Sequence, residues 1–250
     1  MRVFAGPNGS GKSTIQYRLL PEWIGVYVNA DDIERQLRQT GTLDLNAFDL
    51  RGAPLALQQD LRDHLSKSVL LKKHGLEQVA ALLSVEPDSR IHLPRETVNA
   101  YVAAVLADAI RRTLLAQGRT FTFETVMSSP DKIDFMREAQ ELGYRTYLYF
   151  VATDDPEINI SRVKLRVSQG GHDVPEHLIR SRYVRSIGLL DQACRVANRA
   201  YVFDNSGEAH ELLVELVDGE ELRIHAAQLP AWFTGTTLWQ SFQAPSDSES

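Results

Sequence analysis

Short apolar runs alternate along most of the chain with longer stretches whose apolar residues recur at helical spacing. Five apolar runs predict β-strands, at residues 2–5, 26–28, 119–126, 144–152 and 200–207. Strands that alternate with helices are typical of a parallel sheet covered by helices. The pattern therefore predicts an α/β protein with three layers, in which helices lie on both faces of a mostly parallel sheet.

The helices are marked by apolar spacing and by the residues that end them. In the stretch 96–118, Val98, Val102 and Val105 follow helical spacing, and Gly118 ends the helix. Similar patterns predict further helices at residues 128–143, 155–171 and 175–197. The residues from 211 to 225 instead predict a β-hairpin that turns at Asp218-Gly219, within an edge appendage over 209–235.

The segment 36–95 departs from this alternation. It holds two predicted helices, at residues 53–75 and 76–85, with no strand between them. We interpret it as a helical insertion in a core that spans 1–208, where it either covers an acceptor site or only packs against the sheet. The polar residues 244–250 are expected to form a disordered tail.

The stretch AGPNGSGKST, residues 5–14, carries the strongest chemical signal. It fits the P-loop pattern G-x-x-x-x-G-K-[ST] and lies between a predicted strand and a helix predicted over Ser13–Leu20. Glycines let backbone N–H groups approach a phosphate, Lys12 would reach the β- and γ-phosphates, and Ser13 would ligate Mg²⁺. We predict that a nucleoside triphosphate, ATP or GTP, binds to Gly6, Asn8, Gly9, Ser10, Gly11, Lys12, Ser13 and Thr14.

Polar side chains follow several of the predicted strands. In parallel α/β sheets the ligand lies beyond the carboxyl ends of the strands, so these residues form the set of site candidates. They are Asp31 and Asp32 after the second strand, Glu124 and Thr125 at the end of the third, and Asn205 after the fifth. We expect Asn205 to line the nucleobase pocket and the other four to lie near the acceptor.

The carboxylates among them have alternative roles. A buried Glu124 would need a partner, which could be Mg²⁺, a substrate hydroxyl or an arginine. One of Asp31 and Asp32 could cap the following helix while the other acts as general base toward an acceptor hydroxyl. Phosphoryl transfer depends more on alignment and charge neutralisation than on such a base.

Positive charge gathers in the region 155–198. Arg162 and Arg166 are four residues apart and therefore share one helical face. The Gly170-Gly171 break, followed by His172, favours a mobile lid that carries arginines over the nucleotide and places His172 near the substrate. The alternative for each arginine is a solvated basic face.

Net charge, cysteine count and the length of apolar runs argue against several classes of protein. The 250 residues carry a formal charge of −6, which argues against a nucleic-acid partner although a local basic groove is still compatible with it. The single Cys194 cannot form an internal disulfide. The first strand starts at residue 2 and no apolar run approaches membrane-spanning length, so we expect a cytoplasmic protein without a membrane partner.

The ordered set AGPNGSGKST, NADDI, FETV, RVKLRVSQGGHDVPEHLIRSRYVRS and FDNSG resembles the zeta-toxin family of P-loop kinases, in its chromosomal zeta-like branch. The resemblance covers residues 1–35 and 97–207. It departs from the family in three places. Thr125 follows Glu124 where the family has a glycine, His172 stands near the expected second lid arginine, and the insertion has no counterpart.

The resemblance implies a kinase that phosphorylates a sugar hydroxyl of UDP-N-acetylglucosamine and that a small antitoxin holds inactive. It implies Lys12 and Ser13 for ATP and Mg²⁺, Asp31 as the base, and Glu124 with Thr125 near the acceptor or the metal. The lid arginines match Arg162 and Arg166 best. The alternatives are a kinase for a nucleoside, an antibiotic or a nucleic-acid end, and an ATP-gated switch that transfers no phosphate to a small molecule.

Overall fold

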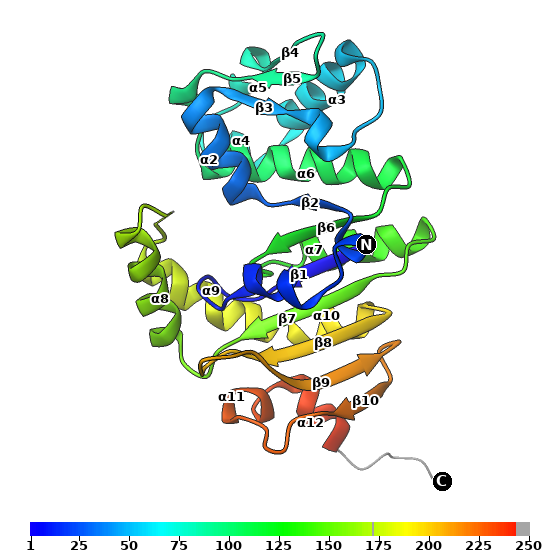
Figure 1. Ribbon diagram of the computed structural model, residues 1–250, viewed down its shortest axis with the longest axis vertical. Coiled ribbons are helices and arrows are strands. Elements are labelled where there is room, and N and C mark those ends of the chain that lie inside the picture. The colour runs from blue at the N-terminus through cyan, green and yellow to red at the C-terminus, as the bar shows by residue number, and fades with distance from the viewer. Residues whose placement is uncertain (172, 244–250) are drawn as a thin grey trace. The chain divides into compact units, whose positions relative to one another are not determined.

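The computed structural model describes residues 1–171 and 173–243 and divides the chain into two compact units (Figure 1). The first unit combines Met1–Leu20 with the chain from Glu124 onward, and the second comprises Pro21–Phe123. The sequence predicts a single core from 1 to 208 with an insertion, whereas the observed division groups the second predicted strand and the helix before the third with the inserted segment.

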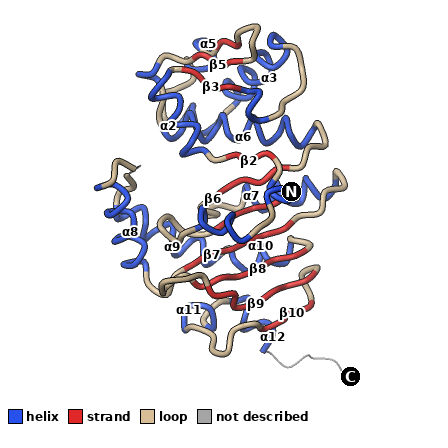
Figure 2. Tube along the Cα trace, viewed as in Figure 1, coloured by secondary structure: helices blue, strands red, loops and turns tan. Residues whose placement is uncertain are grey.

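The first unit contains five neighbouring strands in the order β10-β9-β8-β7-β1 (Figure 2). Their bounds are β1 Arg2–Ala5, β7 Tyr147–Ala152, β8 Arg199–Asp204, β9 Glu211–Val217 and β10 Glu221–Ile224. β1, β7 and β8 are parallel and in register, so that Ala5 pairs with Phe150 and Ala152 with Asp204. The carboxyl ends of these strands therefore lie at one edge of the sheet.

The predicted hairpin is present, and it extends the main sheet. β9 pairs antiparallel with β8 over its whole length, and β10 pairs antiparallel with β9. Asp218 adopts a φ of 48° and Gly219 a φ of 75°, as a tight hairpin turn requires. The hairpin thus adds two antiparallel strands to one edge of the sheet.

The helices of the first unit connect and cover these strands (Figure 1). They are the 3-10 helix η1 Lys12–Arg18 and the α-helices α7 Asp131–Glu141, α8 Pro156–Ser168, α9 Glu176–Gly188, α10 Leu190–Val196, α11 Ala231–Thr234 and α12 Thr237–Gln243. The helix predicted over 175–197 breaks at Leu189, after Gly188, and α10 then packs against β7 and β8. Glycine weakens a helix interior, which makes this change of direction inexpensive.

The helix after the P-loop also differs from its prediction. It is a 3-10 helix that ends at Arg18, because Leu19 is already extended with φ −109° and ψ 151°. Pro21 follows two residues later, and a proline disfavours helical backbone in the residue before it. The helix predicted over Ser13–Leu20 is therefore present as a 3-10 helix that ends two residues earlier than predicted.

The second unit is built around a parallel strand pair and two packed helices. Val26–Val28 of β2 pairs with Phe121–Phe123 of β6, whose full bounds are Phe121–Thr125. The helices α2 Ala30–Thr40 and α6 Ala100–Ala116 pack against each other. The remaining helical elements are α1 Pro21–Ile24, η2 Leu45–Phe48, α3 Pro54–Lys67, α4 Val69–Lys73, α5 Val79–Leu82 and η3 Arg95–Thr97.

The segment 36–95 is not purely helical, so the prediction of a helical insertion is wrong in this respect. It contains a three-stranded antiparallel sheet in the order β3-β5-β4, with bounds β3 Thr42–Asp44, β4 Ser84–Val85 and β5 Arg90–His92. Strands of two or three residues are too short to show a period of two in the sequence. The predicted helix 53–75 also divides, because the Ser68 hydroxyl accepts from Leu71 N at 3.3 Å and starts α4.

The predicted α/β class is confirmed. The core of the first unit consists of fully buried residues on the sheet and on the helices that cover it, among them Phe4, Phe150, Val202, Ile133 and Met136. Over residues 1–171 and 173–243, none of the helices combines the length and the apolar character that crossing a bilayer requires.

Candidate nucleotide site

The P-loop has a backbone that only glycine permits at three positions. Gly6, Gly9 and Gly11 have φ values of 136°, 77° and 90°. A Cβ on Gly6 would lie 2.0 Å from the Val151 carbonyl oxygen, and a Cβ on Gly9 would lie 2.5 Å from the Asn159 carbonyl oxygen. The loop therefore packs directly against β7 and α8, which fixes its position at the carboxyl edge of the sheet.

Three side chains from other elements hold the carbonyl groups of this loop. Asn159 Nδ2 of α8 donates to Asn8 O at 2.6 Å, and Asn205 Nδ2 donates to Ser10 O at 2.8 Å. His210 Nε2 lies 3.1 Å from Gly11 O. Asn159 is itself fixed by the hydroxyl of Thr153, which donates to its Oδ1. The loop is thus held at three of its peptide groups by residues far away in the sequence.

Lys12 lies over the concave side of the loop. Its Nζ donates to Pro7 O at 2.9 Å, and only 9% of the residue is exposed. An ammonium group held across a turn of backbone N–H groups is the arrangement that attracts a phosphate chain. The predicted role of Lys12 is therefore compatible with its position.

Ser13 and Glu124 come together although 111 residues separate them. The Ser13 hydroxyl donates to Glu124 Oε2 at 3.2 Å. Magnesium prefers oxygen ligands in octahedral geometry, in which neighbouring ligand atoms lie about 2.9 Å apart. A hydroxyl and a carboxylate oxygen at this separation fit two adjacent positions around that ion, so the residues present suit the predicted metal. No cluster of three or more acidic, histidine or cysteine ligands occurs among the described residues.

The end of β6 is shaped by Thr125. Its Oγ1 accepts a hydrogen bond from Met127 N at 3.0 Å, and Met127 adopts a φ of 52°. This tight turn follows directly after Glu124 and limits the freedom of the strand end. Thr125 thus has a structural role beside the acceptor role predicted for it.

The segment after β8 is tied to the loop and to the C-terminal helices. Asp204 Oδ1 accepts from Trp232 Nε1 at 2.8 Å and from the Ser206 hydroxyl at 2.7 Å. The amide of Asn205 donates to Ser10 O, so this residue braces the loop beside the nucleobase role predicted for it.

The arginines of the lid region have defined contacts. Arg162 donates to Asn205 O at 2.7 Å and to Gly207 O at 3.2 Å, so it supports the segment after β8. The Arg166 side chain packs against Gly171, so closely that a Cβ on Gly171 would lie 2.5 Å from Arg166 Cγ. Arg182 of α9 donates to Asn8 Oδ1 of the P-loop at 3.3 Å. His172 lies outside the described residues.

The helices α8 and α9 are fastened to each other. Arg180 pairs with Glu157, and Lys164 Nζ lies 2.6 Å from Glu176 Oε1. Between these ion pairs the helices share an apolar cluster composed of Ile160, Val163, Val174, Ile179 and Leu178. The predicted lid region therefore has a packed base, from which Arg182 reaches the loop.

In the second unit, the N-cap of α2 is Asn29, and neither aspartate takes that role. The Asn29 side chain accepts from Asp31 N at 2.9 Å. Asp32 pairs with Arg35 at 2.5 Å, whereas the exposed Asp31 carboxylate has no partner among the residues that the structure describes. Of the two carboxylates, Asp31 is therefore the one that remains available for an acceptor.

A known protein family matches a large part of this chain. The profile of the family described as Zeta toxin matches residues 95–226, more than half of the chain. The chain belongs to the zeta toxin family. The match begins after the P-loop, so the assignment of residues 5–14 rests on their sequence pattern and on the geometry above.

Solved structures of similar fold include AvrRxo1-ORF1:-ORF2 with ATP, at 14% identity and a TM-score of 0.51 over 89% of this chain. The same complex with sulphate ions gives 14% identity and a TM-score of 0.52 over 90% of this chain. An uncharacterized protein of Haemophilus influenzae is 35% identical over 63 residues, or 25% of this chain. The chain spans about three fifths of the solved chains, 59% and 60%, and 45% of the Haemophilus protein. At 14% identity, these solved structures show only that they share the fold of this chain.

No pattern in the sequence of this zeta toxin family member indicates that three residues lie against the P-loop. Arg182 is one of several arginines in α9, and Asn159 lies within a helix whose pattern is set by other residues. His210 lies in a polar stretch before β9. Their distances along the chain from the loop residues that they contact are 151 for Asn159, 174 for Arg182 and 199 for His210.

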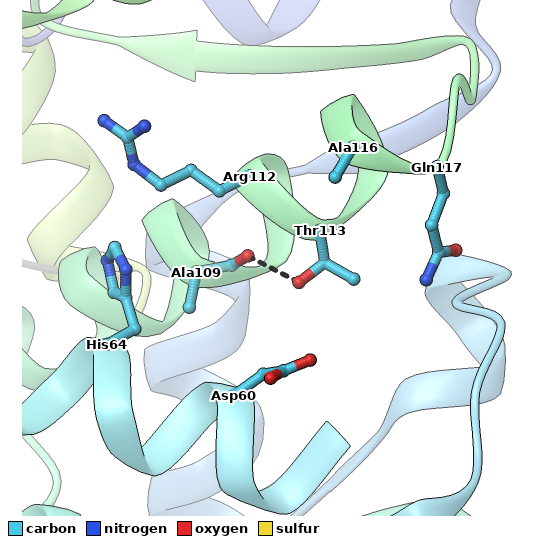
Figure 3. Close-up of a pocket in the computed structure, with 7 residues that line it drawn as sticks. All are labelled: Asp60, His64, Ala109, Arg112, Thr113, Ala116 and Gln117. Atoms are coloured by element: carbon cyan, nitrogen blue, oxygen red, sulfur yellow. Dashed lines mark hydrogen bonds between the residues drawn. The ribbon is translucent and has the colours of Figure 1, made fainter. Parts of the chain in front are cut away.

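A separate hollow lies within the second unit of this family member, between α3 and α6 (Figure 3). Its volume is about 290 Å³, and Asp60, His64, Arg112 and Thr113 are among its lining residues. His64 Nε2 and Arg112 Nε each lie 3.1 Å from Asp108 Oδ2. Because the polar groups around the hollow link α3 to α6, we assign it to the packing of these helices.

Tyr183 anchors α9 and yields a first prediction. Its hydroxyl donates to Thr153 O at 2.6 Å, and burial raises the pKa of Tyr183 to about 12. Replacement by phenylalanine leaves a buried carbonyl without its donor, so we expect a loss of about 1–3 kcal/mol in the free energy of unfolding. Urea unfolding at neutral pH measures this loss.

The same tyrosine gives a pH dependence. Because the folded-state pKa lies above the ordinary value of 10, the contribution of Tyr183 to stability is complete below pH 10 and is lost as the pH rises toward 12. The difference in stability between the wild type and Tyr183→Phe should shrink over that interval. A difference that stays constant would show that the hydroxyl is not held in this hydrogen bond.

Proposed function

We propose that this protein is a nucleoside-triphosphate-dependent phosphotransferase that moves the γ-phosphoryl group of ATP, or of GTP, to an alcohol group of a small molecule. The observation that carries the proposal is the P-loop itself, where Lys12 crosses the turn and Ser13 meets Glu124 at 3.2 Å. Membership of the zeta toxin family supports the same reaction class.

Magnesium would be held by Ser13 and Glu124, and when bound it would neutralise charge on the phosphate oxygens. Lys12 would bind the β- and γ-phosphates through its ammonium group. Arg182 lies beside the loop and is well placed to stabilise charge on the transferring group, together with Arg162 and Arg166 as the other candidates. Packing of α8 on α9 would keep Arg182 in position and would help to exclude water.

Asp31 would accept the proton of the acceptor hydroxyl. Its carboxylate lies in the first turn of α2, where Asn29 already serves as the cap, and it is not engaged by a neighbouring cation in the way Asp32 is. The acceptor oxygen would bond to the γ-phosphorus as the bond from that phosphorus to the bridging oxygen breaks and the nucleoside diphosphate leaves. The proton of the acceptor hydroxyl would move to a carboxylate oxygen of Asp31. Asp32, Glu124 and Thr125 are the further residues that we propose to bind the acceptor.

We propose a nucleotide sugar such as UDP-N-acetylglucosamine as the acceptor and, by family membership, a small antitoxin protein as a partner. The acceptor is tested by incubating the purified protein with ATP, Mg²⁺ and a panel of nucleotide sugars, nucleosides and nucleic-acid ends. We expect a phosphorylated sugar nucleotide, detected by its mass. Transfer only to a nucleoside or to a nucleic-acid end would redirect the proposal to that acceptor, and ATP binding without any transfer would favour an ATP-gated switch.

A further inference from the structure

His210 lies directly before β9 and belongs to no recognised motif, yet it is one of the side chains that touch the P-loop. Its Nε2 lies 3.1 Å from Gly11 O and 3.2 Å from the Thr14 hydroxyl oxygen. A Cβ on Gly11 would stand 3.4 Å from the same nitrogen and 2.3 Å from Asn205 Nδ2. A side chain at this position would collide with Asn205, whereas the contact with His210 would be at an ordinary van der Waals distance.

The position of the imidazole proton follows from these contacts. Gly11 O can only accept hydrogen bonds, and it already receives two from Thr14, one from the hydroxyl at 2.7 Å and one from the backbone N–H at 3.2 Å. Burial lowers the pKa of His210 below its ordinary value, with Arg18 and Arg162 nearby acting in the same direction while the bond to Gly11 opposes them. The ring is therefore neutral at neutral pH, and its single N–H lies on Nε2, where it faces Gly11 O and Thr14 Oγ1.

His210 is held both at its backbone and at its ring. Arg18, at the end of η1, donates to His210 O at 2.9 Å. The ring of Phe203, which β8 holds, meets the imidazole edge to face with centroids 6.5 Å apart. His210 thus links the element that follows the P-loop to the sheet, and it is not a side chain that swings freely.

The contacts of Asn205 and His210 fall on two successive peptide groups. Asn205 holds Ser10 O, and His210 holds Gly11 O. In a trans peptide the carbonyl and the following N–H point in opposite directions, and the described residues contain no cis bond. Holding these two carbonyls therefore turns the N–H groups of Gly11 and Lys12 away from the bracing side chains. N–H groups presented in this way form an anion-binding concavity.

We propose that His210 is a positioning residue that sets the P-loop in its nucleotide-binding shape before the nucleotide arrives. This inference rests on the proposed function, because it assigns His210 to the binding of the triphosphate. His210 acts through the peptide between Gly11 and Lys12 and through Thr14. Its effect therefore falls on nucleotide affinity more than on the rate of transfer.

The test compares His210→Ala, His210→Gln and His210→Asn. The amide nitrogen of glutamine takes the place of Nε2, whereas the amide nitrogen of asparagine takes the place of Nδ1 and does not reach Gly11 O. The dissociation constant for a non-hydrolysable ATP analogue with Mg²⁺ is measured by calorimetry, and KM and kcat are measured with ATP. We expect alanine and asparagine to weaken binding about tenfold, the size of one lost hydrogen bond in a preset site. We expect glutamine to restore binding to within about twofold, and kcat to change little.

His225→Ala serves as the matched control, because it removes an exposed histidine at the end of β10 without touching the loop. If the wild type binds no nucleotide, the proposed function fails and this inference fails with it. If the wild type binds and His210→Ala binds equally well, only this inference is overturned. Equal weakening by glutamine and asparagine would also overturn it, because packing and not the Nε2 hydrogen bond would then be responsible. If the alanine variant does not fold, the contrast between glutamine and asparagine decides alone.

Discussion

Replacing Lys12 by methionine is expected to lower the rate of phosphoryl transfer about 10²–10³-fold, the usual cost of removing one preorganised charge or donor from a transition state. Methionine keeps the length and much of the packing of the buried lysine stem, so the fold should be maintained. The rate is measured as phosphorylated product formed from ATP and the acceptor, and the unfolding midpoint is measured beside it.

Lys72→Met is the matched control for that experiment. Lys72 lies exposed in the last turn of α4, in the other unit of the chain, so its replacement should leave the rate unchanged. If Lys12→Met retains the full rate while folding normally, a transfer reaction at this loop is refuted. The Pro7 carbonyl contact of Lys12 would then be purely structural.

Replacing Asp31 by asparagine is expected to lower transfer on the order of 10²-fold, because a positioned general base contributes at least about that factor. ATP affinity should stay unchanged, since Asp31 is assigned to the acceptor and not to the nucleotide. Product formation and binding of an ATP analogue are measured on the same preparation. Asparagine has the size and shape of aspartate and removes only the charge and the basic oxygen.

Asp32→Asn provides a stringent comparison, because the two aspartates are adjacent in the first turn of α2. Asp32 pairs with Arg35 on an exposed surface, and such a pair contributes at most about 1 kcal/mol to stability. Because Asp32 is assigned to acceptor binding and not to proton transfer, we expect the Asp32 variant to keep most of its kcat while its KM for the acceptor rises. Equal losses in both variants would assign the effect to the charge at the helix start, and an unchanged rate in Asp31→Asn would remove the base from the mechanism.

The local chemistry of the loop could be predicted from the sequence. The positions of Gly6, Gly9 and Gly11 require positive φ, and the spacing of Lys12 and Ser13 from them is fixed by covalent geometry. The conformation of such a loop depends on residues adjacent in the sequence, so it can be predicted before the fold is known. For the same reason the longer strands and α6 were predictable, because their apolar spacing is a local property.

The short elements of the second unit could not be predicted in this way. β3, β4 and β5 have two or three residues each, and their existence depends on pairing between parts of the chain far apart. Likewise the division of the predicted helix at Ser68 depends on a side-chain cap that competes with a continuous helix. In the first case strand pairing decides the outcome, and in the second a local side-chain cap overrides the apolar spacing.

The sequence by itself determined that this protein is an α/β protein with a glycine-rich loop of P-loop pattern, because hydrophobic period and glycine placement act over a few residues. The tertiary structure alone decided which distant side chains reach that loop. Asn159, Arg182, Asn205 and His210 come from three different parts of the chain and converge because parallel strands end at one edge of the sheet. Such convergence depends on the register of the strands and on helix packing, and a local pattern of residues predicts neither.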